Sequence, residues 1–416
     1  MRHIYTSLDI GSDSIKIVVC ELYQNKLNLL ASSSFKSKGI KKGLIMNVEE
    51  ASKCILDSLK NIEQMIGIKI DKVITNIPSY FNEYSIIKNE IEVKGDRVEY
   101  SDINDAINGA IQSKDLKDLE IINYIPVDFN VDEEHNIKNP LGKMGKKLDV
   151  RSVLVTTQKK YVYSVVSLLE ENGIEIVDIS TSGIGDIYAF KNKQIDSSIC
   201  VIINIGSETT NVSLYNKGVI VKNSIISMGG KNITKDIAYI YKTDFDTANN
   251  LKEHFALAHK KNASVSDIYE IKTEVDDELK INQFEISEVV SSRLEEILNL
   301  AKKEINILTS KQIDYIIITG GTSNMADIEY IASDVFKRDI SIGNMKLVGI
   351  RDNKYSSCVG NIIYFINKMK LKGENYSMID DETASRMINY NGGYQDINNE
   401  TMLKKITETF LANRRI

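Results

Sequence analysis

Two turns in this chain have the residue types that an anion-binding turn needs. Gly11 and Ser12 follow an apolar run near the start of the chain, and residues 206–210 (GSETT) follow a second apolar run at 200–205. Glycine lets a ligand approach the backbone closely, and the N–H and hydroxyl groups of such a turn can bind phosphate. A third glycine turn, Gly320-Gly321, follows another apolar run. A single turn of this kind is usually only a turn, but its repetition favours a phosphate-bearing ligand.

Strands must position the first two turns. Residues 8–19 and 200–215 each contain two strand-like runs joined by small residues, which predicts a β-hairpin in each place. The first run of the second hairpin is apolar throughout, as expected of a strand buried on both faces. Two equivalent hairpins so far apart predict a duplicated fold with the ligand between its halves.

The composition excludes several classes of protein. The 416 residues are enough for two to four domains, and the hydrophobic content of 42% is that of a protein with a substantial core. A net charge of −6 without a basic domain argues against a nucleic-acid partner. The four cysteines are isolated, which favours a reducing compartment over disulfides or a metal site. No signal peptide is expected at the N-terminus, and no apolar run is long enough to span a bilayer.

Apolar periodicity gives the remaining elements. Helices are predicted at 49–66, 159–172, 180–191, 233–241, 244–259, 286–308, 325–336 and 354–368, and strands at 26–34, 72–77, 86–92, 119–129, 148–158 and 174–179. The block 85–165 differs in character from its surroundings and is predicted to be a small α+β insertion. Residues 262–286 are polar and irregular, and residues 371–398 have no sustained period, which is typical of a disordered linker.

The order of these features resembles the actin-like ATPase fold that heat-shock chaperones and sugar kinases share. A closer resemblance is to the FtsA family of bacterial cell-division proteins, and it extends over essentially the whole chain. The segments that carry it are the inserted block with its residues 138–142 (KNPLG), residues 230–238 (GKNITKDIA), the helix around 288–300, residues 318–321 (ITGG) and residues 355–360 (YSSCVG). The last feature of this resemblance is a variable linker that runs into a short amphipathic C-terminus.

The resemblance implies an α/β, actin-like two-lobed ATPase fold with a small α+β subdomain inserted in the first lobe, a disordered linker and a C-terminal amphipathic helix. The implied parts are the first lobe (1–84, 166–198 and 346–370), the insert (85–165), the core of the second lobe (199–243 and 301–345), its cap (244–300), the linker (371–398) and the amphipathic helix (399–416).

The resemblance also implies a cleft for ATP or ADP with Mg²⁺. Asp9 would hold water molecules on Mg²⁺, which keeps most of its waters and needs few carboxylates. Lys16 would reach the β- and γ-phosphates, as in actin. Asn249 and Lys252 would lie along ribose and adenine, although Lys252 could also be an ordinary solvated lysine. The other expected nucleotide contacts are Gly11, Ser12, Ser14, Asn204, Gly206, Ser207, Thr209, Gly229, Gly230, Asn232, Gly320, Gly321 and Thr322.

The second hairpin departs from the family pattern, which has a carboxylate before the first glycine and further glycines after it. Here Asn204 takes the place of the carboxylate, and Ser207 and Glu208 replace the glycines. Asparagine cannot act as a base. Glu208 would add a charge near the phosphates, at a cost of about 4 kcal/mol at 4 Å and intermediate dielectric, unless it points away or faces Mg²⁺. The sequence therefore predicts nucleotide binding with slow or absent hydrolysis.

Two further sites are implied for partners. Arg293 and Glu296 occupy positions at which the family binds the C-terminal peptide of the tubulin-like division protein FtsZ, and they share a helix face; an ordinary solvated pair is the alternative. In residues 399–416 one helical stripe is apolar and the flanks are basic, as in an interfacial membrane helix; a helix that docks on the protein's own surface is the alternative. The stripe consists of Met402, Leu403, Ile406, Phe410 and Leu411.

These features together predict a polymerising, ATP-binding adaptor and not an enzyme. It would tether FtsZ filaments to the cytoplasmic face of the membrane at the division septum and bind later division proteins through residues 85–165. An actin-like component of a pilus or secretion machine is one alternative. An ATPase enzyme or chaperone of the same fold is another, which the substitution at Asn204 disfavours.

Overall fold

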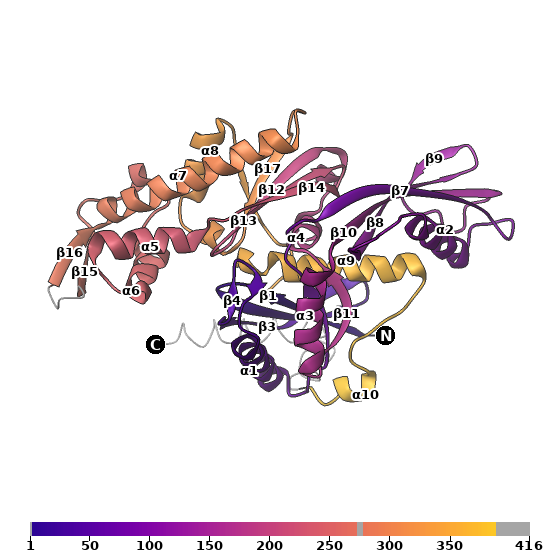
Figure 1. Cartoon of the computed structure of the whole chain (residues 1–416), viewed down its shortest axis with the longest axis horizontal. Helices are drawn as coiled ribbons and strands as arrows, with labels where there is room; N and C mark the ends of the chain where they lie inside the picture. Colours follow the sequence, from indigo (N-terminus) through magenta and orange to yellow (C-terminus); the bar gives the residue numbers. More distant parts are fainter. Residues whose placement is uncertain (1, 273–277, 388–416) are drawn as a thin grey trace, which may run out of the picture.

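The computed structural model describes residues 2–272 and 278–387. Its centre is a pair of five-stranded sheets with the same plan, three antiparallel strands followed by two parallel ones (Figure 1). The first sheet has the order β11 (Glu175–Ser180), β6 (Lys72–Asn76), β1 (His3–Ile10), β2 (Ser14–Tyr23) and β3 (Lys26–Lys36). The second has the order β18 (Ser341–Ile342), β17 (Tyr315–Thr319), β12 (Ile199–Ile205), β13 (Thr210–Asn216) and β14 (Val219–Ile226). The duplication expected from the two hairpins is therefore present.

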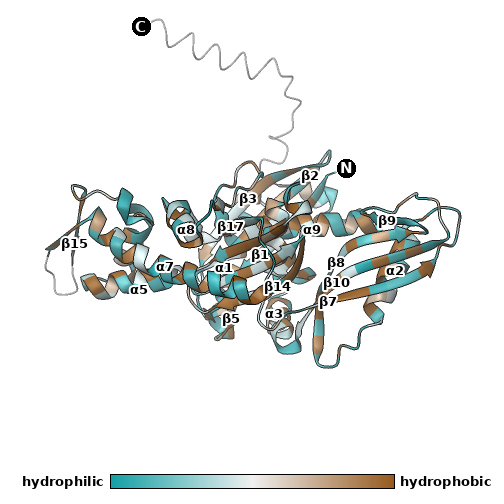
Figure 2. Ribbon diagram, turned by 90° about the horizontal axis from the view of Figure 1, so that it is seen from above, coloured by the Kyte–Doolittle hydropathy of each residue, from teal (hydrophilic) through white to brown (hydrophobic). Residues whose placement is uncertain are grey.

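Helices cover each sheet and bury separate cores. In the first lobe these are α1 (Val48–Ile66) and α3 (Lys159–Glu171), and in the second lobe α5 (Gly230–Tyr241), α7 (Gln283–Leu308) and α8 (Ile328–Phe336). In Figure 2 helices α5 and α7 alternate between hydrophilic and hydrophobic colours. This alternation is expected of helices that place one face against a sheet.

Two helices, α4 (Ser182–Phe190) and α9 (Ser356–Lys372), lie between the lobes and cross each other. Their backbones touch through glycines. A Cβ atom on Gly360 would lie 1.6 Å from the carbonyl oxygen of Gly185, and a Cβ atom on Gly185 would lie 2.4 Å from that of Ser357. Only glycine permits so close a crossing, because any side chain would force the two helices apart.

The insert has its own sheet and core. Strands β7 (Glu83–Glu92), β10 (Lys147–Gln158), β8 (Leu119–Val131) and β9 (Glu134–Ile137) form the sheet in that order, and α2 (Tyr100–Gln112) packs on it. Helix α3 joins the first-lobe core through Val162, Val165 and Leu168, and it also contacts strands β8 and β10 of the insert. The expected end of the insert at residue 165 falls within this helix, and the boundary stays a prediction.

The cap of the second lobe lies at the opposite end of the molecule from the insert (Figure 1). It contains α6 (Phe245–Asn250), a π-helical turn (Leu251–Phe255), a 3₁₀ turn (Lys260–Asn262) and a hairpin of β15 (Ile268–Lys272) and β16 (Glu278–Asn282). The expectation of an irregular segment at 262–286 is wrong where this hairpin forms. A small hairpin, β4 (Ile40–Lys41) and β5 (Leu44–Ile45), lies at the cleft, and 3₁₀ turns lie at Ile195–Ser197, Gly321–Asn324 and Asn353–Tyr355.

The linker expected from residue 371 also differs from the structure, which describes the chain as far as residue 387. Helix α9 continues to Lys372, and the segment after it includes α10 (Asp381–Ala384) and buries Met378 and Met387. The N–H of Met378 donates to the carbonyl of Ile4 at 2.9 Å, and the N–H of Ile4 donates to Ser377 Oγ at 3.0 Å. Strand β6 pairs with β1 only at Ser7 and Leu8, which leaves the edge of β1 open at Ile4. The segment after α9 binds this open edge. The rest of the expected linker and the amphipathic helix at 399–416 lie outside the described residues.

Candidate functional site

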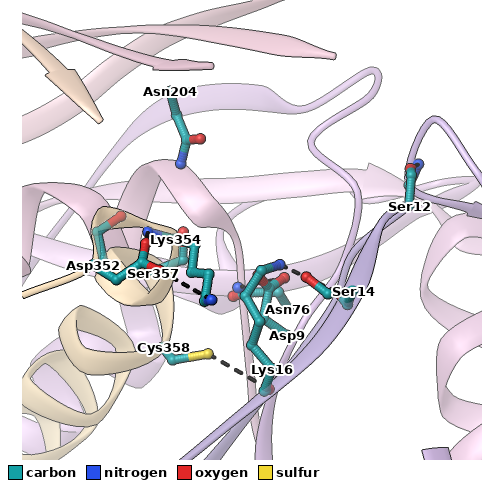
Figure 3. A network of polar contacts seen from close by, with 12 residues as sticks. Asp9, Ser12, Ser14, Lys16, Asn76, Asn204, Asp352, Lys354, Ser357 and Cys358 are labelled. Atoms are coloured by element: carbon teal, nitrogen blue, oxygen red, sulfur yellow. Dashed lines mark hydrogen bonds and ion pairs between the residues drawn. The ribbon is translucent and has the colours of Figure 1, made fainter. Parts of the chain in front are cut away.

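A cavity of about 550 Å³ lies between the lobes, within the size range of small-molecule sites. All the cleft residues expected from the sequence line it, except Gly229 and Asn232. Figure 3 shows Asn204 pointing from one side of this cavity toward Asp9, Asn76 and Lys16 on the other. Residues far apart in the chain thus meet at one site.

The first hairpin, β1–β2, contains a nearly buried ion pair. Lys16 Nζ lies 3.0 Å from Asp9 Oδ2 and donates to the carbonyl of Ser14 at 3.2 Å. Burial opposes the charge on Lys16, but the neighbouring Asp9 outweighs it and raises the pKa of the lysine. Asn76, at the end of β6, donates to the other carboxylate oxygen of Asp9 at 3.4 Å. Asn76 was not anticipated, although the carboxyl end of a parallel strand is a usual place for ligand contacts.

Glycine is required at the first turn. The N–H of Gly11 donates to the carbonyl of Ser14 at 3.2 Å. A Cβ atom on Gly11 would lie 2.7 Å from that same oxygen and 2.8 Å from Lys16 Nζ. Ser12 Oγ accepts from the N–H of Gly43 at 2.7 Å, which fixes the β4–β5 hairpin beside the turn. The first turn therefore has hydrogen bonds on both sides, to its own hairpin and to the β4–β5 hairpin.

The second hairpin, β12–β13, holds its acid differently. Glu208 accepts hydrogen bonds from Lys231 Nζ and from the backbone N–H of Lys42, both at 2.7 Å. Partial burial opposes ionisation, but these two donors outweigh it and lower the pKa of Glu208. The charge that was expected to disfavour phosphate is thus turned toward Lys231 in its own lobe and toward the backbone of the first lobe.

Asn204 is bonded to a carboxylate that the sequence analysis missed. Its Nδ2 donates to Asp186 Oδ2 at 2.7 Å, and Asp186 also accepts from the hydroxyls of Ser356 at 2.6 Å and Ser357 at 3.0 Å. Burial raises the pKa of Asp186 to about 6. The signal available in the sequence was an acid within the apolar run of α4, a helix whose other residues are mostly apolar or small.

The glycine turns close the cavity by backbone contact. Gly320 has φ = +90°, and a Cβ atom there would lie 2.4 Å from Asn204 Oδ1. Gly229 does not line the cavity but supports it from behind, since a Cβ atom on it would lie 2.5 Å from the carbonyl of Gly206. The N–H of Gly229 donates to Asn232 Oδ1 at 3.1 Å, so Asn232 supports the turn.

On the cap side of the cavity, Lys252 is buried and not a solvated lysine. Its Nζ donates to Asn249 Oδ1 at 2.6 Å and to Thr234 Oγ1 at 3.0 Å. Burial lowers the pKa of Lys252. Both residues expected to contact the nucleoside therefore lie together at the cavity wall.

Comparison with known proteins places this geometry in a family. The model of "Cell division protein FtsA" matches residues 201–360, and that of the "SHS2 domain inserted in FTSA" matches residues 84–156, which is the inserted subdomain. The FtsA of Bacillus subtilis strain 168 is 25% identical over 391 residues, covering 93% of this chain and 89% of that protein. The chain belongs to the FtsA family. It is thus a relative of cell-division proteins.

Solved structures agree with the fold expected of an FtsA-family protein. MreB5 of Spiroplasma citri bound to ADP has a TM-score of 0.54 at 16% identity, covering 89% of this chain and 98% of that one. The PilM-PilN type IV pilus biogenesis complex gives a TM-score of 0.55 at 13% identity, covering 86% and 98%. At these identities the likeness concerns the fold alone, and the expected actin-like two-lobed fold is confirmed.

The pair implied for peptide binding in the FtsA family lies on α7. Arg293 bonds Glu296 and also makes two hydrogen bonds to Asp236 of α5, at 2.5 and 3.0 Å. Asp236 was not anticipated. The arginine side chain is 27% exposed, so it is reachable but already paired. A carboxylate of a peptide that binds there must either displace Asp236 from the Arg293 guanidinium or share the guanidinium with it.

The membrane-binding stripe expected in this FtsA-family chain, residues 402–411, lies outside the described residues. Within residues 2–272 and 278–387, no helix is both long enough and apolar enough to cross a bilayer.

Proposed function

We propose that this FtsA-family chain binds ATP, or ADP, with Mg²⁺ in the cavity between its lobes. The observation that carries the proposal is the convergence of two equivalent glycine hairpins on one cavity, with the Asp9–Lys16 pair in its wall. Backbone N–H groups at both turns would bind the phosphates. The likeness to MreB5, whose structure is of an ADP complex, supports a nucleotide as the ligand.

The donor set fits a magnesium nucleotide. Asp9 offers a carboxylate at the cavity wall, and Mg²⁺ typically binds one or two carboxylates together with phosphate oxygens and waters. Lys16, which is bonded to Asp9, would attract the β- and γ-phosphates. Asn249 and Lys252, which line the cavity on the cap side, would contact ribose and adenine. Bound Mg²⁺ would neutralise phosphate charge, while the residues of the chain hold and orient the nucleotide.

The same cavity supports slow or absent hydrolysis. The position that carries a carboxylate in the family pattern is Asn204, whose amide cannot accept a proton from an attacking water. The nearby carboxylate of Asp186 is buried behind it and committed to three hydrogen bonds. We therefore propose that the nucleotide is a structural and assembly ligand, and that the protein is not an enzyme.

The role proposed for the whole chain is that of a polymerising adaptor at the division septum. Arg293 and Glu296 would bind the C-terminal peptide of FtsZ, and residues 399–416 would bind the cytoplasmic face of the membrane. The insert would bind later division proteins. A single short helix binds membrane reversibly, whereas many helices on one filament would bind firmly through effective concentration.

Sedimentation of the full chain with anionic lipid vesicles tests this role, with and without Mg²⁺-ATP and FtsZ peptide, alongside direct measurement of ATP binding. Full-length protein should pellet with vesicles, recruit the peptide and bind ATP with Mg²⁺, while turnover stays well below about 1 per second. F410E adds a charge to the predicted apolar stripe and should release the protein. A412E adds the same charge to the opposite face and should not. R293A should lose the peptide, whereas K303A on the same helix should keep it.

Equal pelleting of F410E and A412E would contradict the membrane role, and absence of ATP binding would contradict the nucleotide proposal. Rapid turnover would favour the alternative of an ATPase enzyme.

A further inference from the structure

Asp186 is a buried carboxylate to which three side chains from two different elements donate. It lies on α4 with 1% of its surface exposed. Its partners are Ser356 and Ser357 at the start of α9 and Asn204 at the end of β12. All three are neutral side chains. A buried carboxylate without a cationic partner is costly and is unusual in folded proteins.

The carboxylate decides how the Asn204 amide is oriented. An ionised carboxylate only accepts hydrogen bonds, so the amide atom at 2.7 Å from Asp186 must be the nitrogen, which donates. The oxygen Oδ1 must then face the other way, toward the side where Gly320 lines the cavity. Gly320 leaves room for it, because a Cβ atom there would lie 2.4 Å from this oxygen.

We infer that Asp186 is a positioning residue that presents the Asn204 carbonyl oxygen, a neutral acceptor, to the magnesium side of the nucleotide. This inference rests on the proposed nucleotide site and deepens it. The acceptor could take a hydrogen bond from a magnesium-bound water without the charge or basicity of a carboxylate. In this view the negative charge expected at position 204 is still present, but it is held one side chain farther from the cavity.

The surrounding charges explain why an asparagine, and not an aspartate, suits position 204 beside Asp186. Asp9 on β1 adds a second negative charge near Asp186, and Tyr215 on β13 is a further titratable neighbour. Burial and Asp9 raise the pKa of Asp186, while its three donors lower it, leaving it at about 6. An aspartate at 204 would place a second carboxylate against Asp186. Two like charges in contact repel each other strongly. Asp186 is therefore compatible with an asparagine at position 204 but not with an ionised aspartate there.

The decisive comparison is between D186L, which removes the acceptor, and D186N, which keeps an amide oxygen there. D186L frees the Asn204 amide to turn its N–H toward the cavity. ATP affinity in the presence of Mg²⁺ should fall about tenfold, equivalent to about 1.4 kcal/mol, with a much smaller change for ATP without Mg²⁺. D186N should stay within about twofold of the unaltered chain. D178N, which alters another buried acid in the first lobe that is paired with Lys368, is the control and should not change the magnesium dependence.

A second comparison needs no nucleotide. N204D should lower the thermal unfolding midpoint by about 2 °C or more, and N204D/D186N should restore most of that loss. The side-chain amide signals of Asn204 in NMR spectra of the nucleotide-free chain should shift in D186L and stay close to their normal position in D186N. If D186L does not fold, the N204D and N204D/D186N pair decides the matter.

These outcomes separate the inference from the proposed function. An unaltered chain that fails to bind ATP overturns the nucleotide site, and the unfolding and amide measurements then decide the positioning role alone. A chain that binds ATP while D186L keeps the same magnesium dependence overturns the inference and leaves the nucleotide site standing. Additive effects of N204D and D186N on unfolding would also overturn it.

Discussion

The two phosphate-type hairpins of this chain share a backbone plan but hold their charges in different ways. In the first, Asp9 and Lys16 pair within the hairpin itself, and both lie at the cavity. In the second, the position before the glycine is the neutral Asn204, and the charge of Glu208 is turned to Lys231 and to the backbone of Lys42. All of these groups line the cavity, but the charges of the first hairpin pair with each other, whereas the charge of the second is bonded to other parts of the protein.

The difference shows that duplication preserved the shape of the hairpins and not their chemistry. Both turns close with a glycine N–H bonded to a carbonyl three residues on, from Gly11 to Ser14 and from Gly206 to Thr209. The strand orders of the two sheets also match. A shared backbone plan therefore does not give the two hairpins the same chemistry. The comparison predicts that equivalent substitutions will have unequal effects.

The largest effect is expected at Lys16. K16M leaves Asp9 without its cation in a site where both side chains are less than one-fifth exposed. Removing one partner of a buried ion pair typically costs about 3–5 kcal/mol, so the unfolding free energy should fall by an amount near the lower end of that range, and ATP affinity should fall steeply. Urea unfolding and calorimetric titration with ATP measure the two effects.

The matched change in the second hairpin's ion pair is K231M. Lys231 is 36% exposed, and pairs of that kind contribute about 1 kcal/mol or less. If the unfolding free energy, measured by urea unfolding, fell as much in K231M as in K16M, the distinction between the two hairpins would be removed.

A smaller difference is expected between the two turn glycines. In G11A the new Cβ would meet a backbone oxygen at 2.7 Å and Lys16 Nζ at 2.8 Å, whereas in G206A the nearest atom would be Thr209 O at 3.1 Å. Overpacking of this degree typically costs about 1–3 kcal/mol, so G11A should lose that much stability and G206A should lose less than about 1 kcal/mol. Paired chemical unfolding curves measure this, and equal losses would mean that the turns are equally constrained.

Local patterns in the sequence were enough to predict most of the elements and the cleft. The two hairpins and the helix expected at 286–308 are present, the helix as α7 from Gln283, because alternation and helical spacing are strong local signals. The glycine and hydroxyl turns at the ends of strands also pointed to part of the cavity lining, whereas Lys16, Asn249 and Lys252 were expected only from the resemblance to the FtsA family.

What local patterns could not provide is the pairing of residues that only the fold brings together. The bond between Asp186 and Asn204 joins α4 to β12, and the contact of Glu208 with Lys42 joins the two lobes. The segment after α9 was expected to be a linker because it is polar, yet two buried methionines and an open strand edge attach it to the first lobe as far as residue 387. Such contacts depend on tertiary structure and leave no periodic signal.

The smallest effect is expected at Glu208, where pH tests the contact between lobes. Lys231 and the Lys42 N–H lower the pKa of this carboxyl against the opposing effect of burial. A lowered folded-state pKa means that the ionised group stabilises the fold above its unfolded pKa, near 4.5, and that this contribution is lost as the pH falls through the lower folded value. E208Q should therefore be slightly less stable than the unaltered chain at pH 7.5, and the gap should close below about pH 4.5. Urea midpoints for both chains across pH 3.5–7.5 measure it. If the stability difference between the two chains instead grew as the pH falls, the ionised Glu208 carboxylate would destabilise the fold. The second hairpin would then resemble a ligand site more than a contact between lobes.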